Sequence, residues 1–186
     1  MSILDSLFGG RKTEMIASDQ AIRGSDTPRY AIPTTHEVLG TPIQGPFPAN
    51  LEVAYFGLGC FWGAERLFWQ TPGVYTTAVG YMGGYTPNPT YEEVCSKTTG
   101  HAECLKIEYD TAKISCDELL EVFWQVHDPT TLNRQGADAG PQYRSVVFYH
   151  NEEQRTKTEK YKAELNKSGA FANPIVTTLE KFDVFY

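Results

Sequence analysis

The chain has 186 residues, of which 41% are hydrophobic and 21% charged, a composition typical of one globular domain. Its formal net charge of -7 argues against a nucleic-acid partner, because phosphate binding needs a concentrated basic face. No run approaches the roughly 20 apolar residues that span a bilayer, and the opening segment MSILDSLFGGRK is not typical of a secretory signal. We therefore expect neither nucleic-acid binding nor membrane insertion.

The cysteines of the chain favour a reducing compartment. Cys60, Cys95, Cys104 and Cys116 are too few and too widely spaced for the disulfide framework of a small secreted domain. No two of them stand at the spacing of about two to four residues that structural zinc sites use, so we expect no metal. The expectation is a monomeric, cytoplasmic protein in which at least one thiol has a chemical role.

Residues 1–50 are predicted to form an extended arm that wraps on a domain of residues 51–186. The arm shows no apolar periodicity. It is rich in proline, which removes a backbone donor and disfavours helix in the preceding residue. The prolines concerned are Pro28, Pro33, Pro42, Pro46 and Pro48.

Beyond the arm, strand and helix patterns alternate along the chain. The expected strands are LEVAYFG, VYTTAVGY, CLKIEYD, YRSVVFY and PIVTTLEKF, at 51–57, 74–81, 104–110, 143–149 and 174–182. The expected helices lie within 59–70, from a capping box of Ser115 and Glu118 to near His127, and from Asn151 to about Lys167. The order predicts a single two-layer α+β domain with helices packed on one sheet.

Two details of this pattern bear on function. Leu105, Ile107 and Tyr109 alternate with polar residues, which indicates a strand buried on one face only. Two long segments rich in turn residues, at 82–100 and 128–143, are expected to be functional loops.

Cys60 is the thiol whose position best suits a nucleophile. It lies between a predicted strand end and a predicted helix start, flanked by Gly59 and Gly63, so a ligand can approach the backbone closely. Unpaired N–H groups and the positive end of the helix dipole favour the thiolate there. The alternative is that Cys60 is a small buried apolar residue, as many free cysteines are.

Side chains around Cys60 in the predicted fold offer a ring-lined pocket and an acid. Phe61 and Trp62 are adjacent in a helix and cannot both face the core, so at least one ring should reach the site. Glu103 stands at the entry to a strand, where an apolar surround would keep its carboxyl protonated and able to donate. Tyr91, Asp138 and Tyr143 are further hydrogen-bonding candidates in the two loops.

Another enzymatic function remains open on the residues alone. Cys60 with His101 or His127 and an acid would also suit a cysteine-dependent hydrolase or acyltransferase.

Four strings together carry a family resemblance. They are GCFWGAER at 59–66, GYMGGYTPNPTYEEVC at 80–95, TGHAE at 99–103 and HDPTTLNRQGADAGPQYRS at 127–145. In this order they closely resemble the A-type methionine sulfoxide reductases, and the resemblance runs from about Phe56 to the end of the chain. It implies a ferredoxin-like α+β core with no metal and no organic cofactor.

The resemblance also implies a mechanism. Cys60 would attack the sulfur of a methionine-S-sulfoxide, free or in a protein, and be left as a sulfenic acid that thioredoxin or another thiol reduces. Glu103 would be the proton donor. Tyr91, Asp138 and Tyr143 would hold the oxygen and its water, and Phe61 and Trp62 would wall the methyl pocket. A domain that binds methionine side chains through this aromatic site without converting them is a third possibility.

Two departures from the family pattern concern its other thiols. Members commonly continue beyond Phe185 and Tyr186 with one or two resolving cysteines, so the expectation is a shortened tail. An external thiol, or one of Cys95, Cys104 and Cys116, would then restore Cys60. Cys104 stands where smaller or aliphatic residues are usual, and since strand neighbours point to opposite faces, it should turn away from the site that Glu103 enters.

Overall fold

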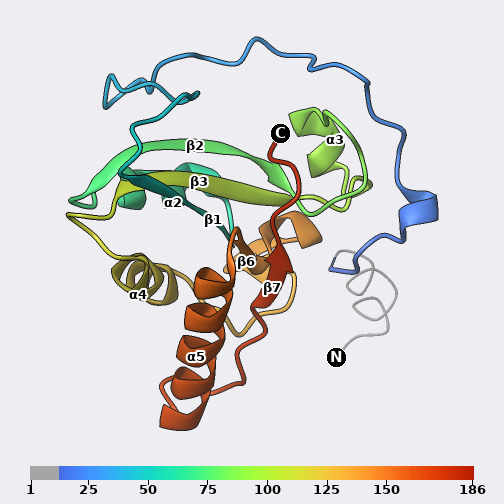
Figure 1. Cartoon of the computed structure of the whole chain (residues 1–186). Coiled ribbons are helices and arrows are strands. Elements are labelled where there is room, and N and C mark those ends of the chain that lie inside the picture. Colours follow the sequence, from blue (N-terminus) through green and yellow to red (C-terminus); the bar gives the residue numbers. More distant parts are fainter. Residues whose placement is uncertain (1–12) are drawn as a thin grey trace.

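Five strands form one mixed sheet in the order β2-β3-β1-β6-β7 (Figure 1). The computed structural model describes residues 13–186; the segment considered as a secretory signal, and with it the start of the arm, lies outside them. All neighbouring strands are antiparallel except β6 and β7, which are parallel. The strands are β1 (Leu51–Leu58), β2 (Val74–Met82), β3 (Ala102–Asp110), β6 (Ser145–Tyr149) and β7 (Thr178–Lys181).

The chain order of the elements makes this a ferredoxin-like core. The helix α2 (Phe61–Trp69) joins β1 to β2, and α4 (Cys116–Val126) joins β3 to β6. The resulting β-α-β-β-α-β unit has its four strands side by side in the order β2-β3-β1-β6. A third helix, α5 (Glu152–Ser168), and β7 extend the unit. The predicted α+β class and mixed sheet are confirmed.

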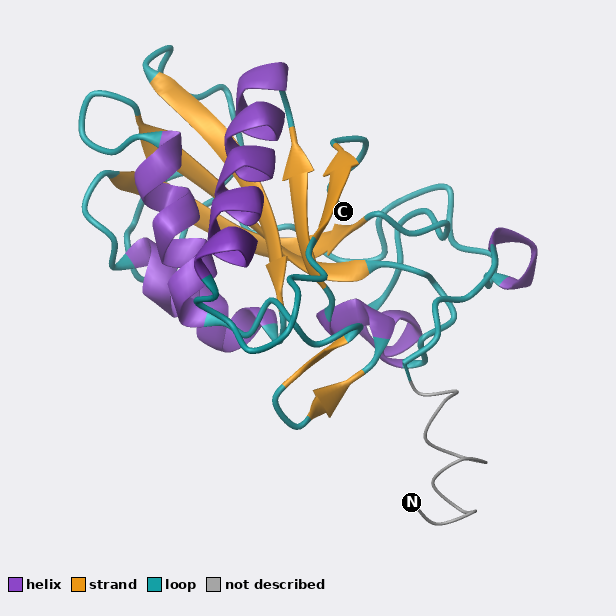
Figure 2. Cartoon of the chain, turned by 90° about the horizontal axis from the view of Figure 1, so that it is seen from below, coloured by secondary structure: helices purple, strands orange, loops and turns teal. Residues whose placement is uncertain are grey.

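The helices pack on one face of the sheet and enclose the main core (Figures 1 and 2). Phe56 of β1 lies at its centre, with its ring centroid 4.9 Å from that of Phe123 and 5.7 Å from that of Phe68. The capping box of Ser115 and Glu118 at the start of α4 is present as predicted, because the side chain of each accepts a hydrogen bond from the other's backbone N–H. Among residues 13–186, no helix has the length and apolar character needed to cross a membrane.

The opposite face of the sheet is also covered, which the alternation in β3 did not predict. Phe182 and Phe185, which follow β7, lie against Tyr55 with ring centroids 4.8 and 5.8 Å away. The chain then reaches the edge strand β2, where Tyr186 and Tyr81 exchange backbone hydrogen bonds of 3.0 and 3.1 Å. The expected half-buried β3 is therefore wrong: the strand is buried on both faces because the end of the chain folds back over it.

Both predicted loops contain regular structure. Residues 82–100 include the short helix α3 (Tyr91–Cys95), which Thr90 and Glu93 cap. Residues 128–143 include a hairpin of β4 (Arg134–Gln135) and β5 (Asp138–Ala139), followed by a 3-10 turn at Pro141–Tyr143. The strand expected at 143–149 begins only at Ser145, after this turn.

The last strand is shorter than the expected 174–182. The backbone N–H of Val176 donates to the carbonyl of Pro129, so this part of the segment bonds to the loop after α4 rather than to β6. Pairing with β6 begins at Thr178.

The described part of the arm, residues 13–50, contains no α-helix and no strand, only one 3-10 turn at Ser18–Gln20 and an isolated bridge between Thr35 and Pro42. It passes beside α3 and then crosses to the β2 side of the sheet (Figure 1). The division of the chain into an arm and a domain at residue 50 stays a prediction.

Replacing Phe123 with alanine should lower the free energy of unfolding by about 3–5 kcal/mol, because it leaves a cavity between α4 and the sheet. Urea denaturation measures the loss. Lys160→Ala, on the exposed side of α5, is the control and should change stability by no more than about 0.5 kcal/mol. Equal stability of the two variants would contradict the central place of Phe123 in the core.

Candidate active site

Cys60 lies at the N-cap of α2, directly after the turn that leaves β1, and is exposed. The turn is possible because Gly59 adopts a φ of +99°. A Cβ on Gly59 would lie 2.7 Å from the side chain of Gln135, so the hairpin β4–β5 approaches this turn closely. The predicted helix-terminal thiol is thus confirmed in position, and the alternative of a buried apolar cysteine is wrong.

Glu103 lies on the helix-covered face near the beginning of β3 and is only 2% exposed. Its Oε2 atom accepts a hydrogen bond of 3.0 Å from the backbone N–H of Phe61, the first residue of α2. Burial raises the pKa of Glu103 to about 7, aided by the charge of Asp138 and opposed by the Phe61 N–H. At neutral pH a large share of Glu103 is therefore protonated, next to the helix start that Cys60 caps.

The two aromatic residues after Cys60 take different positions. Phe61 is 5% exposed, whereas Trp62 is 72% exposed, and their ring centroids are 6.4 Å apart. The phenol ring of Tyr81 lies 5.8 Å from the Phe61 ring. Tyr81 also stands directly opposite Glu103 in the pairing of β2 with β3. Tyr81 is therefore a site residue that the sequence analysis missed, and only the strand register reveals it.

Tyr91, Tyr143 and Asp138 come from three different elements, α3, the 3-10 turn and β5. Burial, followed by the charges of Glu103 and Asp138, raises the pKa of Tyr143. A hydrogen bond with the Cys95 thiol raises the pKa of Tyr91 to about 12. Both phenols therefore keep their protons at neutral pH and can donate hydrogen bonds. Asp138 is exposed and acts on Glu103 through its charge.

The family model described as peptide methionine sulfoxide reductase matches residues 52–186. The chain belongs to this family. It is 57% identical over 150 residues to a peptide methionine sulfoxide reductase MsrA of Salinispora arenicola, covering 80% of this chain and 67% of that protein. It is 49% identical over 188 residues to the MsrA of Brucella anthropi, covering 100% of this chain and 85% of that protein.

Solved structures of the family share the fold. Methionine sulfoxide reductase A of Corynebacterium diphtheriae superposes with a TM-score of 0.81 and 37% identity, covering 93% of this chain and 85% of that one. Reduced Mxr1 of Saccharomyces cerevisiae superposes with a TM-score of 0.70 and 34% identity, covering 75% of this chain and 81% of that one. Mxr1 in complex with Trx2 superposes with a TM-score of 0.58 and 25% identity, covering 80% of this chain and 88% of that one. The reductase fold and its oxidoreductase class are thereby established for this chain.

The other three cysteines of the reductase lie in different surroundings, and all are free thiols. Cys95 is partly exposed at the end of α3, beside Tyr91. Cys104 is fully buried on the sheet face opposite Glu103, with its sulfur 3.4 Å from that of Met82, and burial raises its pKa. The prediction that Cys104 turns away from the site is confirmed. Burial raises the pKa of Cys116, on α4, to about 11.

Neither candidate histidine of the reductase is arranged as a base for Cys60. In His101, Nδ1 accepts from the Gly84 N–H at 3.1 Å and Nε2 contacts the Thr86 carbonyl at 2.7 Å. In His127, Nδ1 contacts the Phe123 carbonyl at 2.6 Å and Nε2 contacts the Ser145 hydroxyl at 2.7 Å. Burial lowers the pKa of both rings, that of His127 to about 4. With both nitrogens of each ring engaged elsewhere, the geometry disfavours a cysteine–histidine acyltransferase.

Arg144 ties together the three loops that surround the site, and the sequence analysis missed it. Arg144 is 4% exposed, and its guanidinium donates to the carbonyls of Gly83, Gly100 and Pro141 at 3.1–3.2 Å. These carbonyls lie after β2, just before β3, and in the turn that carries Tyr143. The only ion pair of Arg144 described in residues 13–186 is a long one of 3.7 Å to Glu180.

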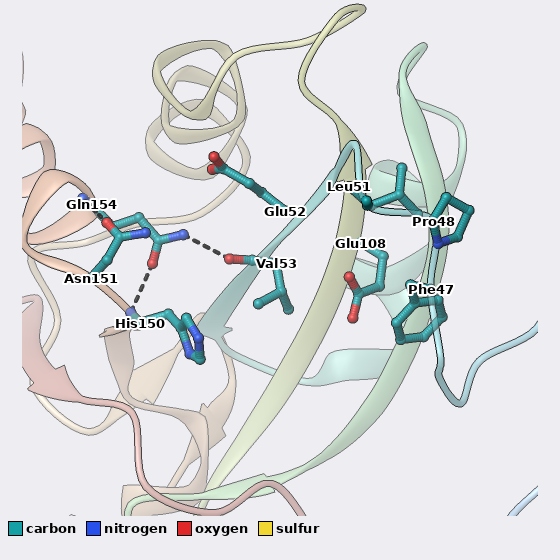
Figure 3. Close-up of a pocket in the computed structure, with 10 residues that line it drawn as sticks. Phe47, Pro48, Leu51, Glu52, Val53, Glu108, His150, Asn151 and Gln154 are labelled. Atoms are coloured by element: carbon teal, nitrogen blue, oxygen red, sulfur yellow. Dashed lines mark hydrogen bonds between the residues drawn. The ribbon is translucent and has the colours of Figure 1, made fainter.

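A separate depression of about 450 Å³ lies elsewhere, between the arm, the sheet and the start of α5 (Figure 3). Phe47, Val53, Glu108 and His150 are among its lining residues, and none of the candidate site residues lines it. Glu108 is paired there with Lys106 at 2.9 Å. Within residues 13–186, no group of three or more histidine, cysteine, aspartate or glutamate side chains is arranged to hold a metal.

Arg144→Met should destabilise the reductase by about 2–4 kcal/mol, because three carbonyls lose their buried donor while the apolar volume is kept. Thermal or urea denaturation checks this. Arg66→Met removes an exposed arginine of α2 and is the matched control. If both variants unfold at the same denaturant concentration, Arg144 does not hold the loops together.

Proposed function

We propose that this reductase reduces methionine-S-sulfoxide, free and in proteins, with Cys60 as the nucleophile and Glu103 as the general acid. One observation carries the proposal: the buried Glu103 carboxyl is hydrogen-bonded to the first N–H of the helix that Cys60 caps. The same short segment therefore places a thiol at a helix terminus and an acid with a raised pKa beside it.

In the proposed step, the Cys60 sulfur attacks the sulfoxide sulfur while Glu103 donates a proton to the departing oxygen. The attack forms a bond between the two sulfur atoms. The protonated oxygen then moves from the methionine sulfur to the Cys60 sulfur, and the bonds of the methionine sulfur to oxygen and to Cys60 both break. Methionine gains two electrons and Cys60 loses two, which leaves Cys60 as a sulfenic acid. Oxide is a poor leaving group unless it is protonated, so an acid with a pKa of about 7, which is still partly protonated at neutral pH, suits this step.

The remaining site residues have supporting roles in the proposal. Tyr91 and Tyr143 are phenols that keep their protons at neutral pH, which supports hydrogen bonds from them to the sulfoxide oxygen. Asp138 would orient a water and, through its charge, help to keep Glu103 protonated. Phe61 and Trp62 would bind the methyl group, which the apolar, partly exposed ring pair supports.

Restoring Cys60 requires two further thiols, which supply the two electrons and release the oxygen as water. We expect thioredoxin or another external thiol in this role, and the exposure of Cys60 supports direct attack by such a partner. No organic cofactor or metal enters this scheme. A cytoplasmic location, which the free thiols favour, and a monomeric state remain parts of the proposal.

Cys60→Ser should abolish the release of methionine from methionine sulfoxide in the presence of dithiothreitol, because a hydroxyl cannot form the sulfenic acid. Cys116→Ala, at a buried position on α4, is the control and should keep nearly full activity. The assay also separates the three functions considered above. Ester hydrolysis without sulfoxide reduction would select an acyltransferase, and binding without conversion would select a methionine-binding domain.

Glu103→Gln should leave substrate binding nearly unchanged but slow a single turnover by about 10² to 10⁴-fold, the usual contribution of a general acid. For the wild type, the fraction of protonated Glu103 falls as the pH rises through about 7, so the single-turnover rate should fall on that alkaline side. The fall should be absent in the glutamine variant, which cannot titrate. Stopped-flow measurements across this pH range check both points, and a full rate for Glu103→Gln would remove Glu103 from the mechanism.

A further inference from the structure

Residues 22–30 of the arm are bonded to residues 86–98, the segment that carries α3. The backbone N–H of Ile22 donates to the Thr98 carbonyl at 3.0 Å, and the Ile22 carbonyl accepts from the Thr86 hydroxyl at 2.9 Å. Ser25 makes two more hydrogen bonds. Its backbone N–H donates to the Pro87 carbonyl at 3.0 Å, and its carbonyl accepts from the side-chain amide of Asn88 at 2.8 Å. The arm thus runs along the whole of this segment.

The backbones approach so closely that only glycine fits at one point of contact. A Cβ added to Gly24 would lie 2.0 Å from the carbonyl oxygen of Pro87. Because the atom that it meets belongs to the backbone, the contact cannot be relieved by a side-chain rotation. The arm and the α3 segment are therefore fitted to each other.

Arg29 bonds to the group that caps α3. Its guanidinium forms an ion pair with Oε2 of Glu93 and donates to the Asn88 carbonyl at 3.1 Å. The same Oε2 atom accepts the Thr90 N–H at 2.8 Å and so completes the capping box of α3. Arg29 consequently holds the carboxylate that defines where the helix begins.

Tyr30 contacts Tyr91 and Glu92, the first two residues of α3. Its hydroxyl accepts a hydrogen bond of 3.2 Å from the backbone N–H of Tyr91 and lies 3.3 Å from the Glu92 carboxylate, to which it donates. The N–H of Tyr91 is one of the amides at the start of α3 that have no partner within the helix. Tyr30 therefore supplies a bond that the helix cannot make for itself.

A helix of five residues is too short to be stable alone, because helix nucleation is unfavourable and must be offset by contacts outside the helix. Val94 is the one buried residue of α3, and the other four are exposed or only partly buried. The polar contacts with Arg29 and Tyr30 are therefore a substantial part of what fixes the helix, and with it the backbone of Tyr91.

We infer that Arg29 and Tyr30 are positioning residues that act through Tyr91, so that the arm, which precedes the region matched by the family model, takes part in sulfoxide reduction. This inference rests on the proposed role of Tyr91 as a donor to the sulfoxide oxygen. Neither arm residue touches the reacting atoms in this account; each fixes the start of α3, from which the Tyr91 phenol extends.

The test is a double-mutant cycle on the rate of a single turnover. Tyr30→Phe removes only the hydroxyl that bonds to Tyr91, and Arg29→Ala removes the bond to the cap. Each should slow the chemical step by about 3- to 10-fold, the size of one or two hydrogen bonds. Arg23→Ala, an exposed arginine of the same arm, is the control and should react at the wild-type rate.

The decisive variant combines Tyr30→Phe with Tyr91→Phe. If Tyr30 acts through Tyr91, the double variant should be no slower than Tyr91→Phe alone, with a melting temperature close to that of the single variants. Multiplied rate losses, a full rate in Tyr30→Phe, or a full rate in Tyr91→Phe would each overturn the inference. Failure of the wild type to reduce methionine sulfoxide would instead overturn the proposed function.

Discussion

The hydrogen bond from the Phe61 N–H to the Glu103 carboxyl is the contact on which the site depends. It joins the first turn of α2 to the beginning of β3, and it lies where Glu103 is almost completely buried. A donor at this position favours the charged carboxylate, whereas burial disfavours it. Burial is the larger effect, so the pKa of Glu103 rises to about 7 instead of falling. The bond therefore orients the acid without removing its proton.

Polar bonds between loops join the segments that surround this contact. Arg144 connects the loops after β2, before β3 and before β6. Gln135 lies against Gly59. Its side-chain amide accepts a hydrogen bond from the Asp128 N–H and donates one to the Asp128 carbonyl, which fixes the β4–β5 hairpin beside Cys60. The arm supports α3 from the other side. Segments far apart in the sequence thus converge on one exposed thiol, while the sheet beneath them supplies a rigid base.

Several of these features follow from local sequence patterns. A strand, a glycine turn and a helix place Cys60 at a helix terminus, and the period of two in a strand turns Cys104 away from Glu103. The capping box of Ser115 and Glu118 is likewise a local signal. Thr90 and Glu93 have the same spacing, so the sequence also contains a local signal for the start of α3. The sequence analysis did not use this signal and interpreted the segment as a loop.

Other features depend on contacts between distant segments and have no local signal. Tyr81 enters the site only because β2 and β3 pair in one particular register, and Arg144 becomes a connector only when three loops meet. The burial of β3 on both faces needs Phe182 and Phe185 to return across the sheet. These are consequences of topology, which residue periodicity cannot supply.

The most direct test of the account is the titration of the Glu103 carboxyl itself, followed by NMR in protein labelled with ¹³C at the glutamate side-chain carboxyl. The Glu103→Gln variant assigns the signal by its disappearance. We expect this signal to titrate with a midpoint near a pKa of about 7. A midpoint for Glu103 at the ordinary glutamate value of 4.5 would contradict its role as a neutral acid beside Cys60.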